Sequence, residues 1–307
     1  MEYNLTTIFD KRTFLSTTER FHIHYYNNIY NKLFVKRDDL IHAEISGNKW
    51  RKLKWNIIRA IENNCNCINT YGGAYSNHLL ATASLGNELN LGTRAYVRGD
   101  ELNHNSNHIL KRCYELNMEL IFLPRNEYKN VKYSNGIDPL NNSTWNVPEG
   151  GANREGVIGC MEIMLETENN YDYVVIAQGT TTTSLGVLNS LNPKTKLIVV
   201  PVLKGFDSIG EMKKLASRCE LPLDIDRILI LDEYHFGGYA KTNIHLNQFV
   251  SDFNNSNPFD IEHTYTGKSL FAMHQVSCTR NSINRACINA FSAANTVFFN
   301  NVSNLRL

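Results

Sequence analysis

The sequence predicts an α/β protein with open, twisted and mostly parallel sheets, arranged as two domains or as one large unit. Short runs of β-branched and apolar residues alternate along the chain with longer segments of helical periodicity, which is typical of βαβ units. The runs at 174–176 and 197–200 are continuously apolar, as in parallel strands that helices cover on both faces. The length of 307 residues exceeds the usual size of a single domain.

The elements expected in the first half of the chain are three helices, each followed by a strand. Glycines at 86 and 92, each preceded by leucine, mark helix ends, where glycine takes the left-handed conformation. Polar, turn-rich segments at 103–107 and 134–143 are expected to be loops. The expected order is helix 49–64, strand 67–71, helix 76–89, strand 94–98, helix 107–116 and strand 119–123.

The second half repeats the alternation without an internal sequence repeat. Its first helix has Val157, Met161, Met164 and Leu165 at the spacing i, i+4, i+7 and i+8 of one apolar face. Since such sheets bind ligands at the carboxyl ends of their strands, functional residues are expected in the loops that follow strands. The expected order is helix 153–168, strand 173–177, helix 181–191, strand 196–202, helix 209–219 and strand 227–231.

The composition excludes several classes of protein. Lys and Arg number 31 against 30 Asp and Glu, so the net charge of +1 gives no electrostatic case for binding nucleic acid or an anionic membrane surface. The longest apolar runs, such as 197–203, are too short to span a bilayer, and the N-terminus lacks the apolar segment of a secretory signal. We therefore expect a cytoplasmic protein with no nucleic-acid or membrane partner.

The seven cysteines agree with a cytoplasmic compartment. They are odd in number and scattered, unlike the disulfide framework of a small secreted domain. Cys65 and Cys67 form a C-x-C pair, but no second pair or histidine doublet completes a zinc site at the usual spacing. We expect no metal site.

A threonine-rich turn follows the strand at 173–177 and opens the next helix. It contains Gly179, Thr180, Thr181, Thr182 and Thr183. Backbone N–H groups and hydroxyls at a helix N-terminus suit a phosphate, although the turn matches neither the Walker loop nor the dinucleotide fingerprint. A Ser/Thr-rich helix cap is the alternative. The cost of consecutive threonines in a helix favours the phosphate site.

A second turn, after the strand at 67–71, contains paired glycines and then Ser76, Asn77 and His78. Glycines permit close approach of a ligand, and serine and asparagine suit a helix N-cap. A plain strand–helix turn and a carboxylate site at the helix N-terminus explain this pattern equally well, because both use the same donors.

Basic residues, among them Lys49 and Lys52, cluster at the start of the helix at 49–64. Positive charges near a helix N-terminus oppose the helix dipole, so helix propensity does not explain the cluster. A face exposed to water is one interpretation. A lysine with a lowered pKa that forms a Schiff base is the other.

Taken together and in this order, the segments resemble the family of 1-aminocyclopropane-1-carboxylate deaminases and D-cysteine desulfhydrases. These are pyridoxal-phosphate enzymes of the tryptophan synthase β fold type (fold type II). The resemblance runs from about residue 35 to about residue 275. The matching segments are VKRDD at 35–39, GNK and RK within 47–52, GG and SNH within 72–78, PEGGAN at 148–153, the threonine-rich turn, residues 232–239, and YTGK at 265–268.

The resemblance implies how the chain is organised. A large cofactor-binding domain would comprise residues 1–50 and 154–307, and a small domain residues 51–153, with the cofactor in the cleft between them. A small amino acid would be the substrate. The family's tendency to dimerise makes a homodimer an expectation by analogy.

The resemblance also implies roles for the cofactor-binding residues. Lys49 would bind pyridoxal 5'-phosphate covalently, for which its amine must be neutral, and desolvation favours the neutral form. Lys52 and the turn from Gly179 to Thr183 would hold the phosphate. Asn77 would bond to the cofactor's phenolic oxygen.

On the substrate side, Ser76 and the backbone amides of Asn77 and His78 would bind the carboxylate. Tyr239 and Tyr265 match the active-site tyrosines of the family, with Tyr265 against the cofactor ring. Together with Lys49, the residues Ser76, Tyr239 and Tyr265 form the expected catalytic set.

Thr266 bears on the choice of substrate. The family's deaminases have a glutamate there, beside the pyridine nitrogen, whereas its D-cysteine desulfhydrases carry threonine as this chain does. A hydroxyl supports a neutral ring nitrogen and a weaker electron sink, which suffices for expelling a thiol after loss of the α-proton. We expect conversion of D-cysteine to pyruvate, sulfide and ammonia. The alternatives are 1-aminocyclopropane-1-carboxylate deaminase activity, which gives 2-oxobutanoate and ammonia, and cofactor binding without turnover.

The resemblance stops after residue 274. The family continues with a helix, a strand and a glycine-rich loop, His-Thr-Gly-Gly in the desulfhydrases, whereas residues 275–307 contain no glycine. A divergent C-terminal element and a change of reading frame near Gln275 both explain this, and the abrupt loss of similarity favours the second. If a central strand were missing, its neighbours would be left with unpaired edges.

Overall fold

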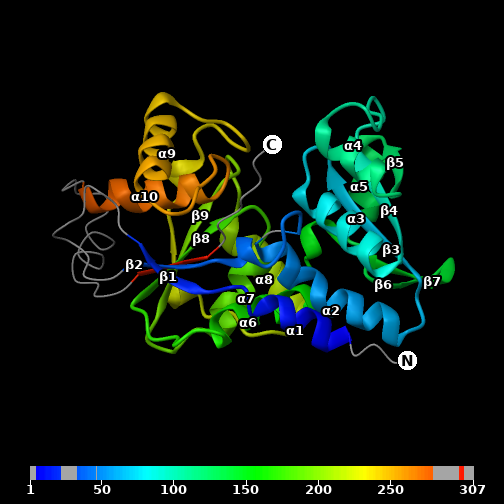
Figure 1. The fold of residues 1–307 in the computed structure, drawn as a ribbon, viewed down its shortest axis with the longest axis horizontal. Helices are drawn as coiled ribbons and strands as arrows, with labels where there is room; N and C mark the ends of the chain where they lie inside the picture. Colours follow the sequence, from blue (N-terminus) through cyan, green and yellow to red (C-terminus); the bar gives the residue numbers. More distant parts are fainter. Residues whose placement is uncertain (1–4, 22–32, 46, 279–296, 301–307) are drawn as a thin grey trace.

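The computed structural model describes residues 5–21, 33–45, 47–278 and 297–300, and these form two sheets in separate halves of the molecule (Figure 1). The larger sheet has the strand order β1-β2-β11-β8-β9-β10 and the smaller the order β5-β4-β3-β7-β6. Most neighbouring strands are parallel. The pairs β1–β2 and β6–β7 are antiparallel. The predicted α/β class is confirmed.

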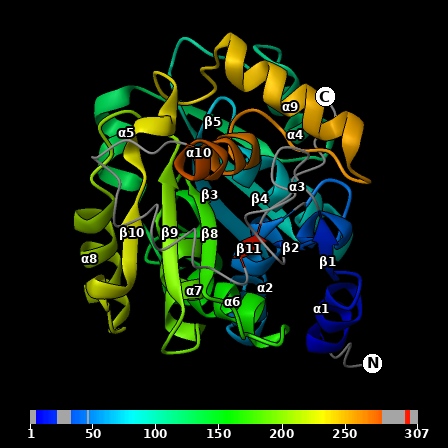
Figure 2. The same ribbon diagram turned by 90° about the vertical axis from the view of Figure 1, so that its left-hand side faces the viewer.

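The larger sheet is a layer between helices (Figure 2). Helices α6, α7 and α8 cover one face and α9 and α10 the other. The strands are β1 (Thr18–Phe21), β2 (Leu33–Lys36), β8 (Tyr173–Gln178), β9 (Lys196–Pro201), β10 (Ile228–Ile230) and β11 (Val297–Asn300). The helices are α1 (Leu5–Thr13), α6 (Arg154–Leu165), α7 (Thr182–Ser190), α8 (Ser208–Cys219), α9 (Ile244–Ser256) and α10 (Thr266–Cys278).

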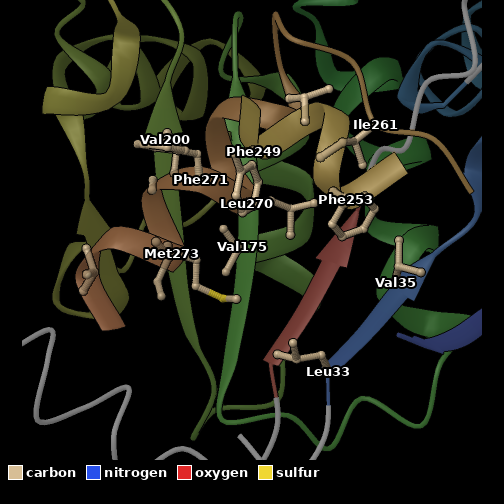
Figure 3. Packing of buried hydrophobic residues seen from close by; sticks show 14 of the residues in the cluster. Leu33, Val35, Val175, Val200, Phe249, Phe253, Ile261, Leu270, Phe271 and Met273 are labelled. Carbon is tan, nitrogen blue, oxygen red and sulfur yellow. The ribbon is translucent and has the colours of Figure 1, made fainter. Parts of the chain in front are cut away.

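Strands β8 and β9 are buried on both faces, as their continuous apolar runs predicted. Val175 and Val200 pack beneath α9 and α10 with Phe249 and Phe271 (Figure 3). Their neighbours in sequence, such as Val174, pack on the opposite face against α6, α7 and α8. Because successive side chains of a strand point to opposite faces, a strand that is apolar throughout must be covered twice.

The smaller sheet lies in the other half of the molecule and is built from the middle of the chain. Its strands are β3 (Cys67–Gly73), β4 (Gly92–Arg98), β5 (Glu119–Leu123), β6 (Gly136–Asp138) and β7 (Asn141–Val147). Its helices are α3 (Asn77–Leu89), α4 (His108–Glu115) and α5 (Arg125–Val131). Residues 67–147 therefore form a unit within the expected small domain, and the domain limits themselves stay a prediction.

Helix α2 (Asn48–Glu62) connects the halves, because it packs against both α6 and α3. Gly159 permits the close packing on α6, since a Cβ there would lie 1.9 Å from the carbonyl oxygen of Arg51. The fully buried Arg51 guanidinium donates to Asp38 at 2.8 Å and to Glu166 at 2.7 Å. Removing one partner from such a buried pair is costly, so these bonds fix α2 against the larger sheet.

All twelve predicted helices and strands are present, with each end within three residues of its prediction. The loop predicted at 134–143 is wrong, because β6 and the start of β7 form a hairpin there. Its polar residues suit an exposed edge strand, where side chains need not be apolar. Helices α9 and α10 and the short strands β1 and β2 were not predicted.

The larger sheet has a central strand from the divergent C-terminal segment. Residues 297–300 form β11, which pairs in parallel with β2 on one side and β8 on the other (Figure 2). The segment Val297-Phe298-Phe299 is of the β-branched and aromatic type that favours strands. The rest of the divergent segment, 279–296 and 301–307, lies outside the described residues. Within the described residues no helix is long and apolar enough to cross a bilayer.

Candidate active site

Lys49 stands in the first turn of α2, which begins directly after Gly47, a residue with φ of 65°. A positive φ is a conformation that residues with side chains rarely adopt, so Gly47 is suited to the turn that starts the helix. The Lys49 Nζ donates to Asn48 Oδ1 at 2.7 Å. Asn48 Nδ2 in turn donates to Thr183 Oγ1 at 2.7 Å, so Asn48 links the amine to the threonine-rich turn.

The Lys49 amine is tuned to be partly neutral near physiological pH. Burial lowers the pKa of Lys49 to about 7, and the positive charge of Lys52 adds to this effect. Lys52 is itself buried, which lowers its pKa as well, and its Nζ donates to Thr180 Oγ1 at 3.1 Å. Of the interpretations of this basic cluster, a face exposed to water is therefore wrong for both lysines.

The threonine-rich turn joins β8 to α7, and Thr181, Thr182 and Thr183 are buried in it. The hydroxyl of Thr181, the N-cap residue, makes no capping bond, and the buried Thr182 Oγ1 has no hydrogen-bond partner among the described residues. Gly179 allows Tyr265 to lie against the turn, because a Cβ there would be 3.0 Å from Tyr265 Cε1. The turn thus offers unused donors at a helix N-terminus beside a buried lysine, which suits an anion.

Ser76, Asn77 and His78 are at the N-terminus of α3, as predicted. Ser76 is the N-cap residue, but its side chain does not cap the helix. Gly72 lies so close that a Cβ there would be 2.8 Å from both Cβ and Oγ of Ser76. The interpretation as a plain turn with a serine cap therefore loses its main support, and the Ser76 hydroxyl is held in place by packing.

The imidazole of His78 was not predicted to take part in the site. It is 2% exposed, and neither ring nitrogen has a hydrogen-bond partner among the described residues. Burial, followed by the charges of Lys49 and Lys52, lowers its pKa well below the usual value, so the ring is neutral at pH 7. Gly151 lies between the groups, since a Cβ there would be 3.1 Å from Lys52 Cβ and 3.6 Å from His78 Cε1.

The two predicted tyrosines lie together. The rings of Tyr239 and Tyr265 are 6.0 Å apart in an edge-to-face arrangement at 72°. Tyr239 Oη donates to the carbonyl oxygen of Tyr75 at 3.3 Å and so reaches from the larger half to the loop before α3. Burial, with the neighbouring Tyr239 and Glu262, raises the pKa of Tyr265, which keeps its phenol protonated.

Thr266 is buried at the start of α10, where it is paired with a carboxylate that the sequence did not bring to attention. Its hydroxyl donates to Glu262 Oε1 at 3.1 Å, and its backbone N–H donates to the same oxygen at 2.7 Å. Glu262 is four residues earlier and accepts further N–H groups from this helix start, including that of Tyr265. An acidic residue just before a helix start is a sequence signal, but the helix start at Thr266 was itself not predicted.

The structure therefore brings most of the predicted residues into one connected group. Asn48 and Lys52 connect α2 to the threonine-rich turn, His78 connects α3 to both lysines, and Tyr265 packs on Gly179. Asn77 is the first residue of α3 and is partly exposed. A partly neutral amine beside an anion-binding helix N-terminus can capture a carbonyl compound that carries a phosphate.

Curated relatives share this chain's organisation at low identity. The chain is 27% identical over 268 residues to a putative 1-aminocyclopropane-1-carboxylate deaminase of Thermotoga maritima, covering 81% of this chain and 85% of that protein. It is 26% identical over 274 residues to the bifunctional D-cysteine desulfhydrase/1-aminocyclopropane-1-carboxylate deaminase, mitochondrial, of Arabidopsis thaliana, covering 79% of this chain and 66% of that protein. The resemblance that the motifs indicated is confirmed. No protein-family model matches the chain.

Solved structures share the fold over nearly the whole chain. A structure described as an ACC deaminase homologue has a TM-score of 0.74 at 19% identity and covers 99% of this chain and 96% of its own. A pyridoxal 5'-phosphate-dependent aspartate racemase has a TM-score of 0.64 at 12% identity and covers 98% of this chain and 94% of its own. At these identities the likeness concerns the fold, and the predicted fold type is confirmed.

Proposed function

We propose that this chain is a pyridoxal-phosphate-dependent enzyme that releases ammonia from a small amino acid, with D-cysteine as its substrate. The observation that carries the proposal is the Lys49 amine, whose pKa is lowered to about 7 and which is connected through Asn48 to the threonine-rich turn. The curated relatives are named as deaminases and a desulfhydrase, which supports this class of chemistry.

The residues present fit the cofactor. Lys49 and Lys52 form no salt bridge with any carboxylate in the described part of the chain, although burial makes an uncompensated positive charge costly. Thr182 Oγ1 and both ring nitrogens of His78 are buried without partners in the same part. A phosphate would supply the missing negative charge and acceptors, and a carbonyl carbon would be the electrophile for Lys49.

When bound, pyridoxal phosphate supplies an electron sink that stabilises negative charge at the α-carbon of an amino acid. The chain supplies the rest. Lys52, Thr180 and the N-terminus of α7 would hold the phosphate, and Ser76 at the N-terminus of α3 would orient the substrate carboxylate. Lys49 Nζ, with a pKa near neutrality, would take up and return the α-proton.

Thr266 supports D-cysteine as the substrate. A neutral hydroxyl at this place is a weaker partner for a ring nitrogen than a carboxylate, and loss of a β-thiol needs a weaker electron sink than opening a cyclopropane. The net reaction consumes water and yields pyruvate, hydrogen sulfide and ammonia.

A second candidate is the ring-opening deaminase. The Glu262 carboxylate accepts a hydrogen bond from the Thr266 hydroxyl, and the backbone N–H of Glu262 donates to Thr266 Oγ1. One lone pair of Thr266 Oγ1 is left as an acceptor, a partner that favours a protonated ring nitrogen more than a free hydroxyl does. The name of the Thermotoga maritima relative points the same way.

A substrate panel tests the proposal. The purified protein, incubated with pyridoxal phosphate, is assayed for pyruvate from D-cysteine, L-cysteine and D-serine and for 2-oxobutanoate from 1-aminocyclopropane-1-carboxylate. Pyruvate from D-cysteine above the other substrates is expected. 2-Oxobutanoate alone would establish the second candidate, and a yellow protein without turnover would leave a cofactor-binding protein.

The variant Lys49→Ala tests the lysine assignment independently of turnover. We expect it to lose the visible absorbance of the lysine-bound cofactor, whereas the exposed control Lys214→Ala keeps it. A visible band that survives in Lys49→Ala, and that resists dialysis, would assign the attachment to another lysine.

A further inference from the structure

The segment that carries Tyr239 connects β10 to α9 and begins with a short 3-10 turn, Asp232–His235. We call residues 232–240 the Tyr239 loop. It reaches the other half of the molecule through the bond from Tyr239 Oη to the carbonyl oxygen of Tyr75. The position of this hydroxyl therefore depends on what holds the loop.

The Tyr239 loop has hydrogen bonds of its own, from the Gly237 N–H to His235 Nδ1 and from the Gly238 N–H to the carbonyl oxygen of His235, but its backbone is strained. Phe236 has φ of 54°, Gly237 97°, Gly238 129° and Ala240 53°. Glycine adopts such values readily, but phenylalanine and alanine rarely do, so contacts from outside the loop must compensate for them.

Helix α10 provides these contacts with apolar and polar groups. On the apolar side, Phe236 packs edge-to-face on Phe271 with ring centroids 5.3 Å apart. On the polar side, Lys268 Nζ donates to the carbonyl oxygens of His235 at 3.0 Å and Gly238 at 2.8 Å. Both carbonyls belong to the stretch with positive φ or border it.

Lys268 is an unusual residue for such a bond. It is 0% exposed and forms no salt bridge with the described residues. Burial lowers its pKa to about 8. Since burying an amine that most proteins leave in water is costly, a structural or functional gain must offset the cost.

We propose that Lys268 is a positioning residue for Tyr239. It stands in the first turn of α10, two residues after Thr266 and three after Tyr265. By holding two carbonyls of the Tyr239 loop against this turn, it sets Tyr239 over Tyr265 and within reach of Tyr75. The inference rests on the proposed function in so far as Tyr239 acts on the substrate.

A double-mutant cycle tests whether Lys268 acts through Tyr239. The variants are Lys268→Met, Tyr239→Phe and the double variant, with Lys213→Met on the exposed face of α8 as a control. In the wild-type background we expect Lys268→Met to lower kcat/KM for D-cysteine about tenfold, mostly through a higher KM. In the Tyr239→Phe background the same substitution should lower kcat/KM less than about threefold. Fully additive losses would overturn the proposal.

Hydrogen–deuterium exchange of the holoenzyme provides a readout that needs no turnover. In Lys268→Met the amides of residues 232–241 should exchange at least about tenfold faster, while those of α7 and α3 stay unchanged. Unchanged exchange in the loop, or faster exchange throughout, would contradict the positioning role. If the wild type turns over no substrate but the loop alone exchanges faster in the variant, the proposed function fails and the positioning role stands.

A milder substitution covers the case in which Lys268→Met does not fold. Lys268→Gln keeps an N–H donor for one carbonyl, and we expect exchange in the loop between those of wild type and the methionine variant. Wild-type exchange and kinetics in Lys268→Gln would overturn the need for a lysine.

Discussion

The amine of Lys49 illustrates how one residue's chemistry depends on its place. Its pKa is lowered to about 7 by burial first and by Lys52 second. Both causes come from the fold, since the two lysines are one helical turn apart on α2 and face the threonine-rich turn. The same side chain on an exposed helix would be protonated at pH 7 and unreactive.

The lowered pKa of Lys49 predicts a pH-dependent stability of the protein without cofactor. The folded-state pKa is about 7 and the unfolded one about 10.5, so above pH 7 the unfolded chain binds more protons. The penalty for burying Lys49 is therefore full below pH 7 and decreases as pH rises. Lys49→Ala should be more stable than wild type at about pH 6, by a margin that shrinks by about 1–2 kcal/mol by about pH 8.5.

Urea unfolding of both proteins at the two pH values measures this margin. The two proteins are compared because buried cysteines act in the opposite direction. Burial raises the pKa of Cys160 to about 11, so the contribution of this thiol to the stability of the folded protein falls as pH rises. Since both proteins carry the same cysteines, that contribution cancels. A margin independent of pH would mean that Lys49 keeps an ordinary pKa.

The neighbouring glycines of the turn before α3 predict a contrast between two similar substitutions. In Gly72→Ala the new Cβ would be 2.8 Å from Ser76 Cβ and Oγ, so Ser76 must move. In Gly73→Ala the nearest atom is 3.3 Å away and belongs to the end of the exposed Arg98 side chain, which can give way. We expect Gly72→Ala to raise KM for D-cysteine by about tenfold or more, and Gly73→Ala to change it little.

Steady-state kinetics and absorbance titration with pyridoxal phosphate separate the possible outcomes. Cofactor uptake should be nearly the same in both alanine variants, because Lys49 and the threonine-rich turn lie on other elements. Equal KM values for the two variants would argue against a role of Ser76 in substrate binding.

Among the secondary-structure elements, α10 depends most visibly on one side chain. The Glu262 carboxylate accepts from the backbone N–H of Thr266, one of the N–H groups that an α-helix leaves without partners in its first turn, and from those of Thr264 and Tyr265 just before the helix. Glu262→Ala should lower the free energy of unfolding by about 1–2 kcal/mol, as loss of an N-terminal cap does. Glu262→Gln, which keeps an acceptor, should cost about half as much.

Chemical denaturation of the two Glu262 variants, with Glu211→Ala in α8 as a matched acidic control, measures these differences. Glu211 is paired with Lys214 in an exposed contact, so its loss should cost little. If Glu262→Ala and Glu211→Ala were equally stable, the carboxylate would contribute no cap. Lower stability of Glu262→Gln than of Glu262→Ala would also contradict the capping role.

How far each element could be predicted depends on whether its signal is local. Strands β8 and β9 are apolar on both faces, so the sequence indicates them directly. Helix α6 is present as predicted, but its predicted face is partly wrong: Val157 and Met164 are buried with Cys160 and Ile163, whereas Leu165 is 70% exposed. The hairpin β6–β7 is polar and exposed at its turn and forms because β7 pairs with β3, which no local pattern reveals. Strand β2 has four residues and gains its stability from β1 and β11.

Whether a residue of the candidate site could be predicted also depends on how local its signal is. Lys49 and Lys52 were predicted as site residues through the resemblance of their segment to the family, since the basic cluster alone left an exposed face as an interpretation; the threonine-rich turn was predicted as a phosphate site from its own residues. The His78 imidazole, Glu262 and Lys268 could not be predicted, because each is defined by groups from another segment or by burial that only the packed chain produces. Residues of this kind position the residues that the motifs indicate, or shift their pKa.

The larger sheet depends on the divergent C-terminal segment, because that segment supplies strand β11. Its backbone lies in the middle of the larger sheet, with β2 on one side and β8 on the other. Without it, both neighbours would present unpaired N–H and C=O groups toward each other across a gap, and exposed edges of this type promote aggregation. The sequence of β11 is unlike that of the family's C-terminal segment. Its backbone pairing therefore takes the structural role that the family's strand would have had.

A truncation tests this dependence. A chain ending at Cys278 lacks β11, whereas a chain ending at Asn300 retains it. We expect the shorter chain to be largely insoluble, or to lose several kcal/mol of stability in urea, because single domains are stable by only about 5–15 kcal/mol. The chain ending at Asn300 should behave like the full chain.

Equal solubility and equal unfolding midpoints of both truncations would show that β11 does not complete the sheet. That result would favour a changed reading frame near Gln275. The nucleotide sequence then decides, since a frame change requires an alternative downstream frame that encodes a strand followed by His-Thr-Gly-Gly.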